Sequence, residues 1–123
     1  MLNLEGRLSI IMPAYNEEKL IYNSIMTTLD IVEKFVKDVE IIAVNDGSCD
    51  NTKKEMQRAV AKDSRVKLLS SDKNRGKGNA IISGVSQASG KYIAFVDADL
   101  ELNPAQLEGY LKKMIDENKD VVI

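Results

Sequence analysis

Residues 39–48 read Val-Glu-Ile-Ile-Ala-Val-Asn-Asp-Gly-Ser, a mostly apolar run that ends abruptly in a polar turn. A short apolar run bounded by such a turn is typical of a buried strand, and all-parallel sheets are built from strands of this kind. In open α/β sheets the ligand lies beyond the carboxyl ends of the strands. This stretch therefore predicts a strand over residues 39–44 and a candidate binding site in the turn that follows it.

On both sides of this strand, short apolar runs alternate with stretches of helical periodicity. Apolar runs at residues 8–12, 66–69 and 92–96 predict three more strands, of which the first ends at Pro13 and the last is buried on both faces. The stretches between the strands, and the one after the last of them, have helical periodicity. The apolar positions expected to face the core from these helices are Ile21, Ile25, Leu29, Val32 and Val36, then Met56 and Val60, then Ile81, Val85 and Ala88, and finally Leu107, Leu111, Met114 and Ile115. This alternation predicts an α/β fold with a mostly parallel sheet flanked by helices.

The length of the chain, 123 residues, predicts one domain. Residues 120–123 read Asp-Val-Val-Ile, which we interpret as a fifth strand that is cut short. A buried parallel strand at a terminus normally leads into another crossover, so we expect residues 1–123 to form a single domain that is truncated at its C-terminus. An unpaired sheet edge exposes backbone hydrogen-bonding groups, and we therefore expect self-association through that edge.

The composition excludes several classes of function. Seventeen Lys and Arg against nineteen Asp and Glu give a net charge of −2, which argues against a nucleic-acid partner because phosphate neutralisation supplies most of that affinity. The chain contains no His, which excludes Ser-His-Asp and Cys-His nucleophile systems and histidine-based zinc sites. A metal would therefore be held by oxygen ligands, which favours Mg²⁺, Mn²⁺ or Ca²⁺. The single cysteine, Cys49, excludes an intramolecular disulfide and indicates a reducing compartment.

Two carboxylates follow the strand at residues 92–96, at Asp97 and Asp99, with Glu101 two residues further on. If the extended conformation continues, residues i and i+2 point to the same side and the two carboxylates converge. Two carboxylates at such a short distance repel each other unless one holds a proton or a cation lies between them. A divalent metal bridged to a substrate diphosphate would therefore suit them. The alternative is an ordinary acidic turn in which Asp99 caps the backbone and Asp97 is solvated.

Three other polar segments fall at the same edge of the predicted sheet. Asp46 could accept hydrogen bonds from a base edge or a ribose hydroxyl, or it could belong to a tight turn with Gly47 at positive φ. The segment 76–78, Gly-Lys-Gly, offers N–H groups and a cation to an anion, although such charges are more often solvated. Tyr15 could stack on a base or pack on a helix, and Glu17 could do no more than favour a helix N-terminus. The convergence of these signals on one edge favours a binding site.

Together the four segments resemble the motifs of glycosyltransferase family 2 in their order and rough spacing. They read Pro13-Ala14-Tyr15-Asn16-Glu17, Asn45-Asp46-Gly47-Ser48, Asn74-Arg75-Gly76-Lys77-Gly78-Asn79-Ala80 and Asp97-Ala98-Asp99. The resemblance extends over residues 8–123, and it looks most like the polyprenyl-phosphate branch, with its dolichol-phosphate mannose synthases and its dolichyl- or undecaprenyl-phosphate glucosyltransferases. It implies the donor-binding half of a Rossmann-like GT-A fold and an inverting transfer of a hexose from a UDP- or GDP-sugar to an acceptor.

The resemblance also implies roles for individual residues. Asp97 and Asp99 match the pair that carries Mg²⁺ or Mn²⁺ and the donor diphosphate and are the expected catalytic residues, while Glu101 matches a position where some members use Gln in the metal site. The positions that match nucleotide-sugar contacts are Pro13, Tyr15, Glu17, Val44, Asp46, Lys77 and Ala98. Asn45 departs from the frequent Asp-Asp-Gly-Ser form. The family's domain also normally continues past the equivalent of Ile123, into a part that supplies the acceptor pocket.

We expect the acceptor to be a lipid phosphate, namely a polyprenyl phosphate, or else a glycan. A lipid phosphate is already anionic at pH 7 and needs no general base, which suits a chain without His. Such an acceptor implies work at the cytoplasmic face of a membrane. No apolar run approaches the roughly 20 residues of a membrane span, and the N-terminus lacks a signal-peptide pattern. We therefore expect a cytoplasmic location with peripheral membrane contact at most.

The same residues also bear on other possible functions. The alternative within the family is a non-catalytic nucleotide-sugar-binding fragment, or a subunit of a longer or split glycosyltransferase, which binds the donor without turnover. A nucleotidyltransferase remains open on chemistry, although its usual Gly-rich signature after the first strand is absent. A phosphoacceptor receiver domain is excluded, because its acidic pair after the first strand is replaced here by Pro-Ala-Tyr-Asn-Glu.

Overall fold

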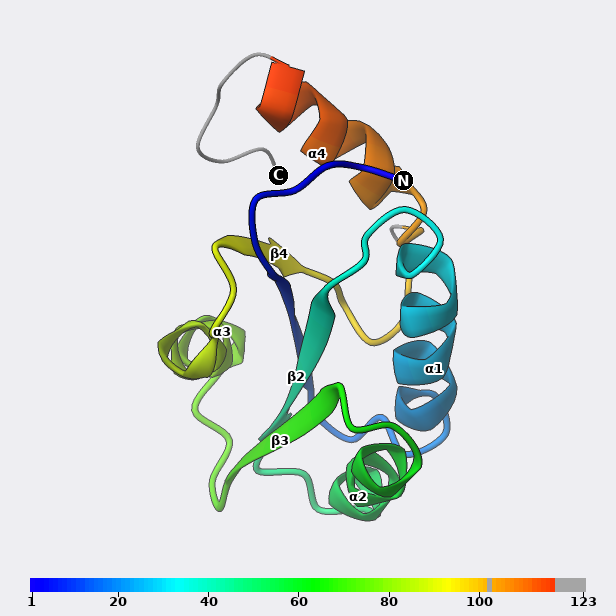
Figure 1. The fold of residues 1–123 in the computed structure, drawn as a ribbon. Helices are drawn as coiled ribbons and strands as arrows, with labels where there is room; N and C mark the ends of the chain where they lie inside the picture. The colour runs from blue at the N-terminus through cyan, green and yellow to red at the C-terminus, as the bar shows by residue number, and fades with distance from the viewer. Residues whose placement is uncertain (102, 117–123) are drawn as a thin grey trace.

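A computed structural model describes residues 1–101 and 103–116 of the chain. Its strands are β1 (Leu8–Ala14), β2 (Val39–Asp46), β3 (Val66–Ser71) and β4 (Tyr92–Phe95), and its helices are α1 (Ile21–Val32), α2 (Thr52–Lys62), α3 (Lys77–Gln87) and α4 (Gln106–Asp116). All strand pairs are parallel, in the order β3-β2-β1-β4. The predicted α/β fold with a parallel sheet flanked by helices is confirmed (Figure 1). The predicted fifth strand at residues 120–123 lies outside the described residues.

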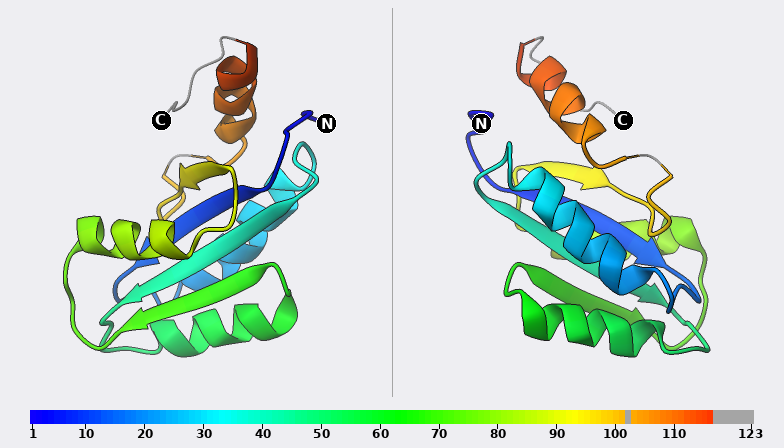
Figure 2. Two further views of the ribbon diagram at one scale, coloured as in Figure 1. Left: turned by 60° about the vertical axis from the view of Figure 1, so that its left-hand side comes forward. Right: turned by 90° about the vertical axis from the view of Figure 1, so that its right-hand side faces the viewer.

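The helices cover the two faces of the sheet unequally. Helices α1 and α2 lie on one face and α3 on the other, whereas α4 lies beyond the β4 edge (Figures 1 and 2). The larger core fills the space between the sheet and α1 and α2, and it includes Val96, Ala98 and the buried residues of α4. A smaller core, formed by Ile11, Ile42, Val44 and Ala80, lies under α3. A Cβ added to Gly84 of α3 would come within 2.5 Å of Ile11 Cγ2, so glycine allows this helix to approach the sheet closely.

Three strands extend further than the sequence predicts. β1 runs through Pro13 to Ala14, β2 continues to Asp46, and β3 continues to Ser71. The N–H of Val96 donates to the carbonyl of Ile11, so odd-numbered residues of β1 turn their backbone groups toward β4. Because β4 pairs with β1 only as far as Ile11, the sheet requires no N–H at Pro13 and the proline is tolerated inside a strand.

The prediction that the strand at residues 92–96 is buried on both faces is wrong. Ile93 and Phe95 are 39% and 38% exposed, because α3 packs mainly over β1 and β2 and covers this face of β4 only in part. Three helical residues predicted to face the core are exposed as well, namely Val60, Val85 and Ile115. Each lies on the flank of its helix, beside better placed residues such as Ala59 and Met114. No helix in the described part of the chain is long and apolar enough to cross a membrane.

A buried carboxylate ties the strands together at the amino-terminal end of the sheet. Glu40 of β2 is 2% exposed, and its Oε2 accepts hydrogen bonds from Ser9 Oγ at 2.6 Å and from the N–H and Oγ of Ser89, both at 2.8 Å. Its Oε1 accepts no well-directed hydrogen bond among the described residues and instead forms ion pairs with Lys67 Nζ at 2.7 Å and Arg7 Nη1 at 3.7 Å. This cluster joins three strands to the segment that follows α3.

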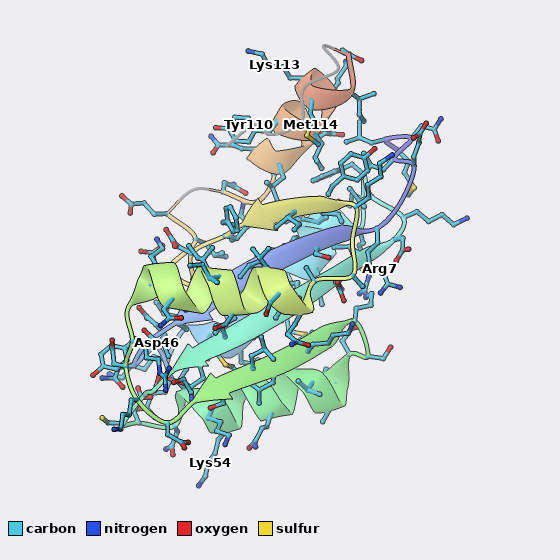
Figure 3. All side chains as sticks on the ribbon, turned by 90° about the vertical axis from the view of Figure 1, so that its left-hand side faces the viewer. Arg7, Asp46, Lys54, Tyr110, Lys113 and Met114 are labelled. Carbon is cyan, nitrogen blue, oxygen red and sulfur yellow. The ribbon has the colours of Figure 1, made fainter. Side chains whose placement is uncertain are left out.

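The register brings the carboxyl ends of the central strands level with one another. Ala14 lies beside Asn45, and Asp46 lies beside Ser71. The chain proceeds outward from β1 through β2 to β3, and then returns to place β4 on the other side of β1. Such a reversal of strand order opens a crevice beyond the carboxyl ends of the strands, which is where ligands of open α/β sheets bind. Figure 3 shows Asp46 at this end of the sheet and Arg7 at the opposite end.

Candidate functional site

A cleft of about 320 Å³ lies at the carboxyl ends of β1, β2 and β4, a volume at the lower end of the range for small-molecule sites. The predicted site residues that line it are Pro13, Tyr15, Glu17, Asp46, Lys77, Asp97, Ala98 and Asp99. Ala14, Asn74 and Gly76 complete its lining, and they belong to the motifs but were not among the predicted contacts. Two predicted residues are not part of it, because Val44 packs in the core under α3 and Glu101 lies beyond the turn that follows β4.

The loop after β1 is held in place by the loop after β2. Asn16 has a φ of +52°, a left-handed conformation that Asn adopts more readily than most residues. Its N–H donates to Ser48 Oγ at 2.9 Å, and its Oδ1 accepts the N–H of Cys49 at 2.8 Å. These bonds fix the backbone on the carboxyl side of Tyr15, whose side chain is 44% exposed and lines the cleft.

Thr52, at the start of α2, is a buried residue that anchors the loop after β1. It is completely buried, and its Oγ1 accepts the N–H of Glu17 at 2.8 Å while donating to Asp50 Oδ1 at 2.5 Å. Partial burial by itself would raise the pKa of Asp50, but the hydrogen bonds from Thr52 and from the N–H of Glu18 outweigh it and lower the pKa below its ordinary 3.8. Glu17, which lines the cleft, is therefore positioned from α2 rather than from its own strand.

Thr52→Val is expected to lower the free energy of unfolding by about 1–3 kcal/mol, because the partly buried N–H of Glu17 and carboxylate of Asp50 each lose a hydrogen-bond partner. Chemical denaturation measures the loss. Thr27→Val, on an exposed position of α1, is the matched control and should change stability by no more than about 0.5 kcal/mol. Thr52→Ser keeps the hydroxyl and should recover most of the loss, and equal effects of Thr52→Val and Thr27→Val would contradict the role of the hydroxyl.

The side chain of Asp46 forms hydrogen bonds with the loop that leads into α3. This side chain is buried, and its Oδ1 and Oδ2 accept the N–H groups of Arg75 and Gly76 at 2.9 and 3.1 Å. The adjacent Gly47 has a φ of +68°, and a Cβ at this position would lie 2.3 Å from Asn74 N. The tight-turn interpretation of Gly47 is therefore confirmed. The carboxylate of Asp46 lines the cleft and shapes it through the loop that it binds.

The two aspartates after β4 lie on a turn rather than on a continued strand. β4 ends at Phe95, the N–H of Leu100 donates to the carbonyl of Asp97 at 3.0 Å, and Leu100 has a φ of +52°. Between the aspartates, Ala98 is buried and its carbonyl accepts a hydrogen bond from Ser24 Oγ of α1. This anchor leaves the exposed side chains of Asp97 and Asp99 on the wall of the cleft.

The chemistry of these side chains fits a hard divalent cation. Asp97 and Asp99 offer carboxylate oxygens in one cleft, and Mg²⁺ is commonly bound by one or two carboxylates together with water and substrate phosphates. Within residues 1–101 and 103–116, no three acidic or cysteine side chains gather into a metal-binding group, so Glu101 is not brought together with the two aspartates. Instead, its N–H donates to Asp99 Oδ1 at 3.0 Å.

A cation already faces one of these carboxylates. Lys77, the first residue of α3, places its Nζ 2.6 Å from Asp97 Oδ1. The preceding Gly76 has a φ of +95°, a conformation that glycine adopts readily. The site therefore combines two carboxylates, a lysine and the N-terminal end of a helix, an arrangement suited to a ligand that carries both a divalent cation and an anion.

Comparison with known proteins connects this arrangement to one family. The family model described as Glycosyl transferase family 2 matches residues 9–123. The chain is 36% identical over 123 residues to the dolichyl-phosphate beta-glucosyltransferase ALG5D of Trichomonas vaginalis, with 94% of the chain and 38% of the relative covered. It is 32% identical over 118 residues to the undecaprenyl-phosphate 4-deoxy-4-formamido-L-arabinose transferase of Proteus mirabilis, with 95% and 36% covered. The chain thus spans little more than a third of the length of these relatives.

Two solved structures have a similar fold. Residues 1–349 of TarS from S. aureus in complex with UDP align with a TM-score of 0.74 and 26% identity, covering 91% of this chain and 33% of that one. The mannosyltransferase PcManGT from Pyrobaculum calidifontis, in complex with GDP-Man and Mn²⁺, aligns with a TM-score of 0.78 and 24% identity, covering 90% and 33%. The fold of the described residues is therefore that of the Rossmann-like part of GT-A glycosyltransferases.

Proposed function

This chain belongs to glycosyl transferase family 2, and from that membership we propose that its cleft binds the nucleotide-sugar donor of an inverting hexosyl transfer. The observation that carries the proposal is the gathering of Tyr15, Asp46, Lys77 and the pair Asp97 and Asp99 around one cleft at the reversal of strand order. A nucleoside diphosphate sugar needs a surface for its base, acceptors for its hydroxyls and positive charge for its diphosphate. In this proposal Tyr15 offers the surface for the base, Asp46 accepts from the hydroxyls, and Lys77 together with a metal on Asp97 and Asp99 provides the positive charge.

In this proposal each segment of the cleft has its own task. Pro13, Tyr15 and Glu17 contact the base and ribose from the end of β1, and Asp46 closes that end of the site. Val44 supports this wall from the core under α3 rather than through direct contact. Ala98 packs against the nucleotide between the two aspartates. These groups position the donor so that an acceptor oxygen attacks the anomeric carbon as the nucleoside diphosphate leaves.

The cofactor in this proposal is Mg²⁺ or Mn²⁺ on Asp97 and Asp99, with Glu101 as a further ligand if the turn after β4 moves. When bound, such an ion would neutralise the charge that develops on the departing diphosphate. The similar fold of PcManGT, which is in complex with GDP-Man and Mn²⁺, supports the choice of a divalent cation. The structure of TarS in complex with UDP supports a nucleotide ligand.

The acceptor we propose is a polyprenyl phosphate. Support comes from two relatives whose names contain the lipid phosphates dolichyl phosphate and undecaprenyl phosphate. An anionic phosphate oxygen requires no base in the cleft, which agrees with a chain that contains no His. With this acceptor, the protein would act at the cytoplasmic face of a membrane through peripheral contact.

Calorimetric titration with UDP and GDP, each with and without Mn²⁺, tests the donor site directly. We expect one nucleotide to bind, and to bind only when the metal is present. The corresponding sugar nucleotides would then identify the hexose. Failure of both nucleotides to bind in the presence of Mn²⁺ would contradict the proposal.

The second candidate function is donor binding without transfer, as a fragment or subunit of a longer or split glycosyltransferase. The observation in its favour is that the chain spans only 36–38% of the two relatives described above. Incubation with the identified sugar nucleotide, Mn²⁺ and a polyprenyl phosphate separates the two. Glycosylated lipid supports the transferase, whereas binding without product supports the second candidate.

A further inference from the structure

The ion pair between Lys77 and Asp97 connects α3 to the loop after β4 across the candidate site. Lys77 Nζ lies 2.6 Å from Asp97 Oδ1, and the two side chains are 61% and 52% exposed. Both residues line the cleft. Ion pairs between side chains this exposed are weak, so a ligand that competes for either partner can separate them at small cost.

The backbone of Lys77 is anchored while its side chain can move. Asp46 accepts the N–H of Gly76, the residue immediately before Lys77, and Lys77 itself begins α3. The N-terminal end of α3 thus lies next to Asp46, as Figure 3 shows. From this anchor the ammonium is carried on a flexible four-carbon stem, so it can reach either Asp97 or a ligand in the cleft.

The Lys77–Asp97 ion pair uses a carboxylate oxygen that a divalent cation would need. The need for this cation rests on the proposed function. Asp99 Oδ1 already accepts the N–H of Glu101 at 3.0 Å, so Lys77 takes up one of the remaining oxygens of the pair. An ammonium in contact with Oδ1 and a metal ion on the same carboxylate would repel each other as like charges. A bound metal and the present position of Lys77 therefore compete.

We propose that Lys77 is a placeholder cation for the metal. In the free protein it neutralises Asp97; when the divalent cation binds, the ammonium leaves the carboxylate and pairs with the diphosphate of the donor. The N-terminal end of α3 also attracts anions, so the second partner lies within reach of the same residue. Because the diphosphate draws Lys77 away from Asp97, nucleotide and metal favour each other's binding.

Lys77→Gln tests the placeholder, since it removes the charge and keeps a polar side chain. Lys54→Gln is the matched control, because it makes the same change of charge at an exposed position on the outer helix α2 (Figure 3). Mn²⁺ binding to the nucleotide-free protein is measured from the paramagnetic resonance signal of free Mn²⁺. Binding of UDP and GDP is measured by calorimetry at saturating Mn²⁺.

Lys77→Gln should bind Mn²⁺ about threefold to tenfold more tightly than the wild type, and bind the nucleoside diphosphate about tenfold more weakly. Lys54→Gln should match the wild type in both measurements. A purely structural role of Lys77 would weaken both, so the opposite signs are the signature of the exchange. Unchanged or weaker Mn²⁺ binding by Lys77→Gln overturns the placeholder and leaves the proposed function standing, whereas a wild type that binds no nucleotide with Mn²⁺ overturns both.

Discussion

Asp99→Asn is expected to weaken Mn²⁺-dependent binding of the nucleoside diphosphate by at least a factor of ten, about 1.4 kcal/mol. The substitution removes one of two negative charges from the wall of the cleft, and an amide is a much poorer metal ligand than a carboxylate. It should leave the turn intact, because the amide oxygen of Asn can still accept the N–H of Glu101 that Asp99 Oδ1 accepts now. The expected loss is therefore one of charge and not of structure.

Calorimetry with and without Mn²⁺ measures this loss, and thermal unfolding checks that the fold is retained. Asp30→Asn is the matched control, since it makes the same change of charge at an exposed position of α1 outside the cleft. It should bind the nucleotide as tightly as the wild type. A titration that is the same for Asp99→Asn and the wild type would remove Asp99 from the metal site.

Glu40→Gln should produce the largest loss of stability, about 3 kcal/mol in the free energy of unfolding at pH 7. Burial by itself raises the pKa of Glu40, but the ion pair with Lys67 and the hydrogen bonds from Ser9 and Ser89 outweigh it and lower the pKa from 4.5 to about 2. A carboxylate with a depressed pKa stabilises the fold by the free energy of that difference. The amide of Gln keeps the shape of the Glu40 side chain but lacks the negative charge that Lys67, Ser9 and Ser89 face.

The effect of Glu40→Gln should depend on pH in a defined direction. Glu40 contributes its full stabilisation above pH 4.5, where the carboxylate is charged in both the folded and the unfolded chain, and loses it as pH falls toward about 2. The difference between wild type and variant should therefore shrink between these values. Urea denaturation at pH 7, 4 and 3 measures this difference, with Glu108→Gln at an exposed position of α4 as the control. A difference that stays constant over this range would exclude the charge of Glu40 as the cause.

Local patterns in the sequence were sufficient to predict the elements of the fold. Each buried strand required an apolar run, and each helix that packs on the sheet required apolar residues at helical spacing. The ends and faces of the elements were less predictable because they depend on neighbours. Pro13 lies inside β1 because β4 stops short of it, and Phe95 is 38% exposed because α3 packs mainly on β1 and β2.

The place of the candidate site also followed from local patterns. Polar segments after buried strands meet at one edge in any parallel sheet, so Tyr15, Asp46 and Asp99 could be assigned to the same cleft before their neighbours were known. Val44 and Glu101 do not line that cleft. Strand alternation turns Val44 into the core under α3, and the turn at residues 97–100 carries Glu101 past the cleft.

The partners of the polar side chains were decided only by the tertiary structure. Asp46 accepts the N–H of Gly76, 30 residues away in the sequence, and Ser24 donates to the carbonyl of Ala98, 74 residues away. Glu40 accepts the N–H of Ser89, 49 residues away. Ser24 and Glu40 give no signal in the sequence, because they look like ordinary helix and strand residues there. Apolar periodicity is a local property that a chain carries in its sequence. Contacts between distant polar groups exist only once the order and register of the strands, and the face on which α3 lies, bring them within hydrogen-bond distance.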